Sequence, residues 1–293
     1  MSGFDATGGH QRPPGPVDDG HDPELHAMRA ASFGTSAAAY AEHRPDYPPA
    51  AIRWALEAMR TTDSGGAGPV PRVLDLAAGT GKLAAQLASP DLIGRQVAVA
   101  AVEPDPRMRA ELRRRAPGLP VLAGTAEAIP LAAATIDAVF VGQAAHWFDL
   151  DRAMPELARV LRPGGLLAGL WNGHDDRIGW VAGLYSVVGH RSEVAYSSWA
   201  QGGQDSISRW LGPTGRPPFG PPTCAGFGHA QLRTAGSLIE TLRTHSNYLV
   251  GDPEMTDAKL ATIRLYLGAQ PETAIGQFAL PLYTHAVRVV RRA

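Results

Sequence analysis

Cysteine, lysine and long apolar runs are all scarce in this 293-residue chain. Its one cysteine, Cys224, excludes an intrachain disulfide and suits a reducing compartment. No stretch approaches the ~20 apolar residues that a membrane-spanning helix needs. Residues 1–22 also lack the apolar segment of a secretion signal. We therefore expect a cytoplasmic protein without a membrane partner.

A strong excess of one charge is missing as well. The chain has 27 Lys and Arg against 28 Asp and Glu, a formal net charge of −1 at pH 7. Nucleic-acid partners require concentrated positive charge. The densest basic run, residues 113–115, falls at the end of an expected helix, where arginines complement the helix dipole on a solvated face. We expect no nucleic-acid partner, and the sequence leaves monomer and homodimer both open.

The N-terminal part divides into a tail and an arm. Residues 1–30 are rich in Gly, Pro, Asp and His without apolar periodicity, which predicts a disordered tail. Its histidines lack the spacing of a ligand set, so we expect no metal site. Residues 31–62 follow as an arm and a helix, in which Ile52, Leu56 and Met59 share one face.

From residue 70 onwards, short apolar segments alternate with helical patterns. We expect strands at 71–75, 97–103, 119–123, 135–142 and 165–171, and helices at 81–88, 106–115 and 151–161. This alternation is typical of βαβ units that form a parallel sheet covered on both faces. Further along, we expect helices within 179–190, 237–249 and 252–268, and a closing strand at 278–292.

The stretch "DLAAGTGK", residues 75–82, predicts a strand end, a tight glycine turn and a helix start. Gly79, Gly81 and Ala84 fit the dinucleotide fingerprint G-x-G-x-x-G/A, and Glu103 ends the next strand, where an acid binds ribose hydroxyls. The glycines alone therefore leave a nicotinamide dinucleotide and another adenosine ligand both open.

Three further features favour a different adenosine ligand. Asp75 lies so close to the turn that it would repel a pyrophosphate, whereas it suits a ligand with an ammonium and a sulfonium. "GTAEAIP" (124–130) follows the third expected strand, and "LARVLRPGGLLAGLW" (157–171) predicts a helix, a Pro-Gly-Gly turn and a strand.

Together with "VEPD", these motifs resemble the class I S-adenosylmethionine-dependent methyltransferases over roughly residues 73–171. "FGTSAAAYAEHRPDYP" and "GQAAHWFD" narrow the resemblance to the small-molecule subgroup called methyltransferase type 11, which includes trans-aconitate-methyltransferase-like proteins. The resemblance implies an α/β fold that is Rossmann-like and doubly wound. It implies a mostly parallel seven-stranded sheet with an antiparallel last strand and helical lid insertions. Residues 70–172 would be the cofactor-binding core, and 173–293 the lid and substrate side together with the C-terminal strands.

The resemblance also implies which residues bind S-adenosylmethionine. They are Tyr40, Arg44, Asp75, Ala77, Gly79, Thr80, Gly81, Glu103, Pro104, Met108, Thr125, Ala126, Glu127, Gln143 and Ala144. The 31–62 arm would fold over the cofactor, with Arg44 on its carboxylate or else in a surface ion pair. Ala77 replaces a glycine that the family often has, and its methyl group fits if φ is negative. Thr125 stands where the family often has aspartate.

The acceptor side is expected beyond the fourth and fifth strands. His146, Trp147, Trp171 and Asn172 are the candidate pocket residues. His146 is either a general base, a pocket wall or a structural residue. We expect methyl transfer to the O, N or C atom of a small molecule. A non-catalytic S-adenosylmethionine or S-adenosylhomocysteine binding module, and an NAD-dependent oxidoreductase, are the alternatives.

Overall fold

The computed structural model describes residues 44–59, 69–188, 218–243 and 253–292. The expected tail, Tyr40 and most of the loop-rich stretch between 175 and 222 lie outside these ranges. Within them, no helix is long and apolar enough to cross a membrane.

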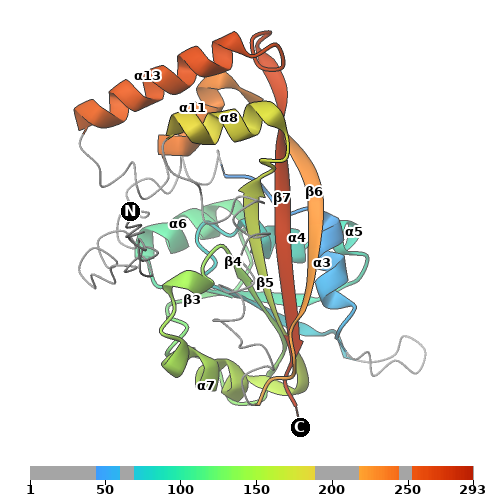
Figure 1. The fold of residues 1–293 in the computed structure, drawn as a ribbon. Coiled ribbons are helices and arrows are strands. Elements are labelled where there is room, and N and C mark those ends of the chain that lie inside the picture. The colour runs from blue at the N-terminus through green and yellow to red at the C-terminus, as the bar shows by residue number, and fades with distance from the viewer. Residues whose placement is uncertain (1–43, 60–68, 189–217, 244–252, 293) are drawn as a thin grey trace, which may run out of the picture.

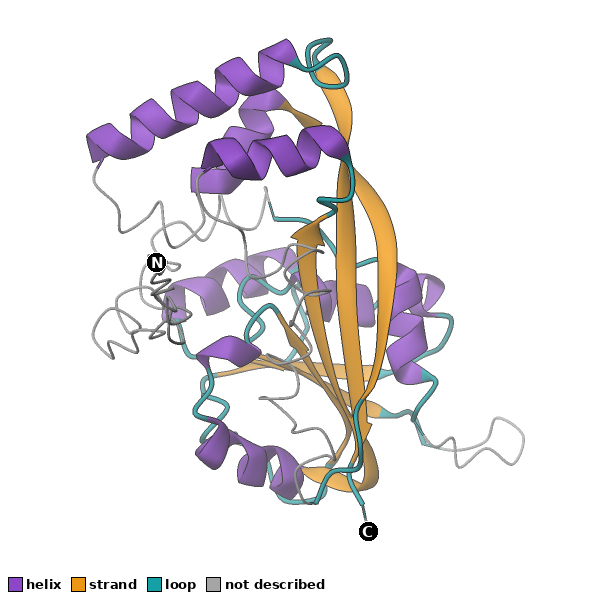
Figure 2. Cartoon of the chain, viewed as in Figure 1, coloured by secondary structure: helices purple, strands orange, loops and turns teal. Residues whose placement is uncertain are grey.

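Seven strands form one twisted sheet (Figures 1 and 2). They are β1 (Arg72–Leu76), β2 (Ala98–Val102), β3 (Val121–Leu122), β4 (Ile136–Gly142), β5 (Leu161–His174), β6 (Thr223–Thr234) and β7 (Gln277–Val290). Their order is β3-β2-β1-β4-β5-β7-β6, and β7 runs antiparallel to both of its neighbours. This confirms the predicted mostly parallel, seven-stranded sheet with an antiparallel last strand.

Most boundaries follow the apolar pattern, with two differences. The expected Pro-Gly-Gly turn lies inside β5 as an irregular segment, since the register with β4 jumps between Ile136 and Ala138 and Gly164 has a φ of 80°. The second difference is β6, for which the sequence raised no specific expectation. Its inward side chains alternate with exposed Gly and Ala residues, so its apolar signal is weak.

The helices are α3 (Pro49–Leu56), α4 (Lys82–Leu87), α5 (Pro90–Ile93), α6 (Pro106–Arg115), α7 (Leu150–Val160), α8 (Gly179–Val188), α11 (Ala235–Arg243) and α13 (Pro253–Ala269), with a 3₁₀ turn η1 (Ala145–Trp147). Local chemistry starts α6 where it was predicted. Asp105 caps it by accepting hydrogen bonds from the N–H groups of Arg107 and Met108, and Pro106 occupies the first turn.

Apolar side chains cover both faces of the sheet. Leu157 of α7 and Phe219 belong to the core of one face, and Ile52 of α3 and Leu87 of α4 to that of the other. The central strand β1 is buried from Val73 to Leu76, as a parallel strand between two helical layers must be.

A third apolar cluster lies at the far end of β7. It joins α8, α11 and α13 to Phe278, Leu280 and Leu282. Figure 1 shows these three helices above the carboxyl ends of β4 and β5. The sheet thus carries a helical layer on the edge where ligands bind in open α/β folds.

Candidate functional site

The strand order reverses between β1 and β4, and backbone strain gathers at this point. Only three non-glycine residues in the described ranges have positive φ, and two of them follow β1 and β4: Ala77 and Gln143, both at 56°. A negative φ was expected to let the methyl group of Ala77 fit, and this expectation is wrong. An alanine in this region costs ~1–2 kcal/mol, and such strain clusters at functional sites.

The glycine turn after β1 has the predicted shape. Gly79 and Gly81 have φ values of 56° and 82°, which favour glycine. A Cβ on Gly81 would lie 2.6 Å from the Leu112 side chain, whereas a Cβ on Gly79 would meet nothing within 4 Å. Gly81 therefore packs the turn against α6, and Gly79 leaves open space beside the turn.

Glu103, at the end of β2, reaches back to this turn. Its Oε2 accepts the backbone N–H of Gly79 at 2.8 Å and its Oε1 accepts that of Asp105 at 2.9 Å. The side chain is 6% exposed, and burial raises its pKa in spite of these bonds. Each carboxylate oxygen keeps a second lone pair, so the predicted role of accepting ribose hydroxyls stays a prediction.

Asp75 is the most perturbed acid of the site. Its side chain is 1% exposed, and burial raises its pKa from 3.8 to about 8, with a smaller contribution from the negative charge of Glu103. Within the described chain, neither Asp75 Oδ2 nor the buried Thr80 Oγ1 has a hydrogen-bond partner. A cluster of this kind is typical of a ligand site, because unpaired buried polar atoms are costly.

Other predicted cofactor residues surround the turn at varying exposure. Met108 and Ala126 are 3% exposed and Ala144 is 8% exposed, whereas Pro104 and Thr125 lie on the surface. The Glu127 carboxylate accepts the N–H of Asp149 at 3.0 Å, ahead of α7. Which of these residues contact a cofactor stays a prediction.

On the acceptor side, the predicted residues do not share one environment. His146 is exposed on η1, with its ring 4.9 Å from that of Trp147. Trp147 and Trp171 are half-buried and pack against one apolar core. Asn172 lies on the other face of β5, where its side chain is hydrogen-bonded to residues 45 and 46. His146, Trp147 and Trp171 are therefore the ones that remain candidates for a common pocket wall.

Arg44 begins the described chain beyond the end of β5. It and Arg233 of β6 contribute to a low pKa of His174, about 4, for which burial is the main cause. This places Arg44 near the predicted acceptor side, and its pairing with a cofactor carboxylate stays a prediction.

Sequence reasoning missed the residues that hold this arm. Gln86 of α4 bonds the backbone of Tyr47, and Asn172 of β5 bonds residues 45 and 46 while accepting from Thr284 of β7. The residues that hydrogen-bond the segment "HRPDYP" lie far from it in the sequence. No local pattern could therefore predict them.

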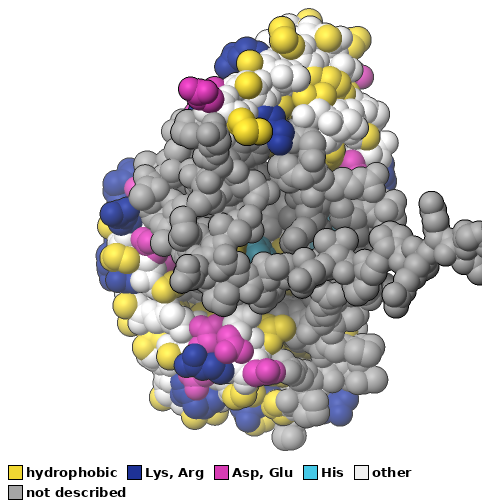
Figure 3. All heavy atoms as spheres, turned by 60° about the vertical axis from the view of Figure 1, so that its left-hand side comes forward, with side chains coloured by type: hydrophobic (Ala, Val, Ile, Leu, Met, Phe, Trp, Pro, Cys, Tyr) yellow, Lys and Arg dark blue, Asp and Glu magenta, His cyan; other side chains and the backbone are white. Residues whose placement is uncertain are grey.

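Charged side chains of both signs lie on the described surface. Figure 3 shows blue and magenta side chains close to one another where the chain is described. Arg114 and Arg115 of the basic run pair with Glu111. In the residues that the structure describes, no group of three or more His, Cys, Asp or Glu side chains is placed to hold a metal ion.

Comparison with known proteins finds similarity to methyltransferases. Residues 74–169 match the family model described as a methyltransferase domain. An uncharacterized methyltransferase of Mycobacterium tuberculosis is 48% identical over 158 residues, which are 54% of this chain and 59% of the relative. An uncharacterized methyltransferase-like protein of Schizosaccharomyces pombe is 32% identical over 170 residues, which are 57% of this chain and 62% of the relative. The match thus spans less than two-thirds of either relative.

A solved methyltransferase structure from Anaeromyxobacter dehalogenans has the same fold. It aligns with a TM-score of 0.53 at 20% identity, and covers 85% of this chain and 97% of that one. The strand order is that of the class I methyltransferase fold. Within this fold, residues 74–169 are similar to the methyltransferase domain family.

Proposed function

We propose that this chain transfers the methyl group of S-adenosylmethionine to a small-molecule acceptor. The carrying observation is the buried pair of acids at the glycine turn, Asp75 and Glu103, because Asp75 Oδ2 has no hydrogen-bond partner in the described chain. A cationic ligand group would satisfy that oxygen and lower the pKa of Asp75.

The residues present fit this cofactor. Glu103 has lone pairs left for two hydroxyls, and the turn leaves open space beside Gly79. Thr80 Oγ1 adds a buried hydroxyl without a described partner. Bound S-adenosylmethionine would supply an electrophilic methyl group on its sulfonium. The acceptor atom would bond the methyl carbon as the carbon–sulfur bond breaks, and the sulfur would leave as a neutral thioether.

A dinucleotide fits less well. In dinucleotide-binding turns the amides face the pyrophosphate. Here the Gly79 amide donates to Glu103, and a second acid lies beneath the turn. Both features favour a positively charged ligand over an anionic one.

The chain itself needs to supply mainly alignment. Holding a nucleophile in line with the methyl group at contact distance is worth ~7–11 kcal/mol of the barrier. Trp147 and Trp171 are aromatic surfaces at the ends of β4 and β5, where an acceptor would lie and where a sulfonium gains from an aromatic face. His146 is exposed on η1 beside Trp147, and its imidazole is the group that would take the proton of a phenol, amine or carbon acid. A carboxylate acceptor would need no base.

Isothermal titration of the full chain with S-adenosylmethionine, S-adenosylhomocysteine and NAD tests the ligand. We expect heats with the two adenosyl-sulfur ligands and none with NAD. Turnover is then followed as S-adenosylhomocysteine formation with a panel of small acids, phenols and amines. Binding of NAD alone would overturn the proposal. Tight binding of S-adenosylmethionine with an acceptor site filled by the protein's own side chains would favour the non-catalytic module.

A further inference from the structure

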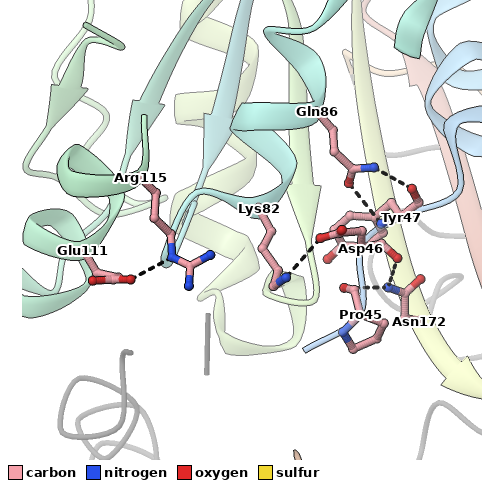
Figure 4. A network of polar contacts seen from close by, with 8 residues as sticks. All are labelled: Pro45, Asp46, Tyr47, Lys82, Gln86, Glu111, Arg115 and Asn172. Carbon is pink, nitrogen blue, oxygen red and sulfur yellow. Dashed lines mark hydrogen bonds and ion pairs between the residues drawn. The ribbon is translucent and has the colours of Figure 1, made fainter. Parts of the chain in front are cut away.

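Residues 45–47 are held against the core by side chains from two distant elements (Figure 4). The Tyr47 N–H donates to Gln86 Oε1 at 3.0 Å, and Gln86 Nε2 donates back to the Tyr47 carbonyl at 2.7 Å. Both residues are at least nine-tenths buried. This reciprocal pair fixes the backbone of Tyr47 on α4, because breaking it would leave a buried amide and a buried carbonyl unsatisfied.

Asn172 holds the same segment from β5. Its Nδ2 donates to the carbonyl of Asp46 at 3.1 Å and lies 3.4 Å from that of Pro45. Lys82 adds an ion pair with Asp46 at 3.0 Å, which is exposed and contributes little. We call the contacts of Gln86, Lys82 and Asn172 with residues 45–47 the clasp.

A chain of hydrogen bonds extends the clasp across the sheet. Thr284 Oγ1 of β7 donates to Asn172 Oδ1 at 2.5 Å, and His229 Nε2 of β6 lies 2.9 Å from the same hydroxyl. The Thr284 hydroxyl donates its proton to the Asn172 amide oxygen. Its own oxygen must therefore accept a hydrogen bond from His229 Nε2. His229 therefore carries a proton on Nε2, and the donors run from β6 through β7 and β5 to the arm.

The clasp meets the cofactor side at two points. Gln143, in its strained position after β4, donates its Nε2 to the backbone carbonyl of Asn172 at 2.7 Å. In addition, a Cβ on Gly142 would lie 2.5 Å from the Tyr47 hydroxyl, so the ring of Tyr47 packs directly on the end of β4. Asn172 thus joins Gln143 through its main chain to the arm through its side chain.

We propose that Asn172 is a positioning residue for cofactor binding, which acts through Gln143 and through residues 45–47. This inference rests on the proposed function. The predicted role of Asn172 was direct contact with the acceptor. Its amide NH₂ instead donates to the backbone of residues 45 and 46, its oxygen accepts from Thr284, and its side chain is 6% exposed. The effect on methyl transfer is therefore indirect, because Asn172 fixes residues 45–47 through its side chain and holds Gln143 through its main chain.

The test uses two buried Thr→Val variants of equal shape in the full chain. Thr284→Val removes the donor to Asn172 Oδ1. Thr241→Val removes a similar hydroxyl in α11, which bonds a carbonyl of its own helix. We expect Thr284→Val, and likewise Asn172→Ala, to raise the Kd for S-adenosylmethionine by about tenfold, the size of one buried hydrogen bond lost. Both should also speed amide hydrogen exchange in peptides covering residues 45–50. Thr284→Ser keeps the hydroxyl, so both readouts should stay at their wild-type values.

Thr241→Val should lower the melting temperature without moving either readout. Wild-type Kd and exchange in folded Asn172→Ala and Thr284→Val would overturn the inference. If the wild-type protein binds no S-adenosylmethionine, the proposed function fails. In that case, unchanged exchange at residues 45–50 in Asn172→Ala and Thr284→Val would by itself reject the clasp.

Discussion

The Gly79 amide and the Glu103 carboxylate meet at 2.8 Å, and this contact ties the end of β2 to the turn after β1. A charged acceptor on a backbone N–H is a strong hydrogen bond, and here it is buried. The carboxylate therefore shapes the glycine turn before any ligand arrives.

Replacing this acid should weaken cofactor binding. Glu103→Gln keeps the shape but swaps an acceptor oxygen for an NH₂ that opposes one of the two amides. We expect the Kd for S-adenosylmethionine to rise at least about tenfold, since charge-assisted bonds are worth ~1.5–3 kcal/mol. Titration calorimetry measures this, with the exposed Glu254→Gln in α13 as the control. Equal Kd values for the two variants would remove Glu103 from the binding site.

Asp75 should make the ligand-free protein less stable as pH rises. Its carboxyl group binds a proton more tightly when folded, with a pKa of about 8 against 3.8. Its contribution to stability is therefore complete below pH 4 and is lost as the pH rises to about 8. Asp75→Asn lacks this loss, so its unfolding free energy relative to wild type should increase by at least about 1 kcal/mol between pH 5 and pH 8. Urea unfolding at both values measures it. Parallel pH profiles of the two proteins would contradict the buried acid.

The two glycines of the turn should respond differently to alanine. Gly79→Ala adds a Cβ to open space and costs only the positive-φ penalty, ~1–2 kcal/mol. Gly81→Ala has that penalty and also presses a Cβ against Leu112, which adds ~1–3 kcal/mol. Chemical denaturation should rank wild type above Gly79→Ala and that variant above Gly81→Ala. The reverse order of the two variants would show that the turn is packed in another way.

His146 should act on the acceptor step and not on cofactor affinity. Its ring is exposed on η1, which follows β4. We expect His146→Gln to leave the Kd for S-adenosylmethionine within about twofold and to lower kcat. If the ring is a base, kcat falls by ~10²–10⁴-fold. If it is a pocket wall, KM for the acceptor rises instead. A tenfold weaker cofactor affinity would place His146 elsewhere in the mechanism.

Local patterns predicted where several elements of the parallel half of the sheet begin. β1, β4 and α6 start within one residue of their expected positions, because apolar periodicity and capping act over a few residues. The positive φ of Ala77 was not predictable, since it depends on where β1 meets β4. Asn172 was expected at an acceptor pocket. Its partner Asp46 lies 126 residues earlier in the chain, and local residue spacing cannot predict a contact over that distance.

One end of β7 extends beyond its pairing with β5. Its residues 282–288 pair with both β5 and β6, whereas residues 277–281 pair with β6 alone. A two-stranded ribbon is marginal in water by itself, so this ribbon and the apolar cluster of α8, α11 and α13 must stabilise each other. The helical layer is thus an outgrowth rooted in two strands, which can be gained, lost or reshaped as a single block. Sequence change can accumulate in that block while the parallel half of the sheet stays intact.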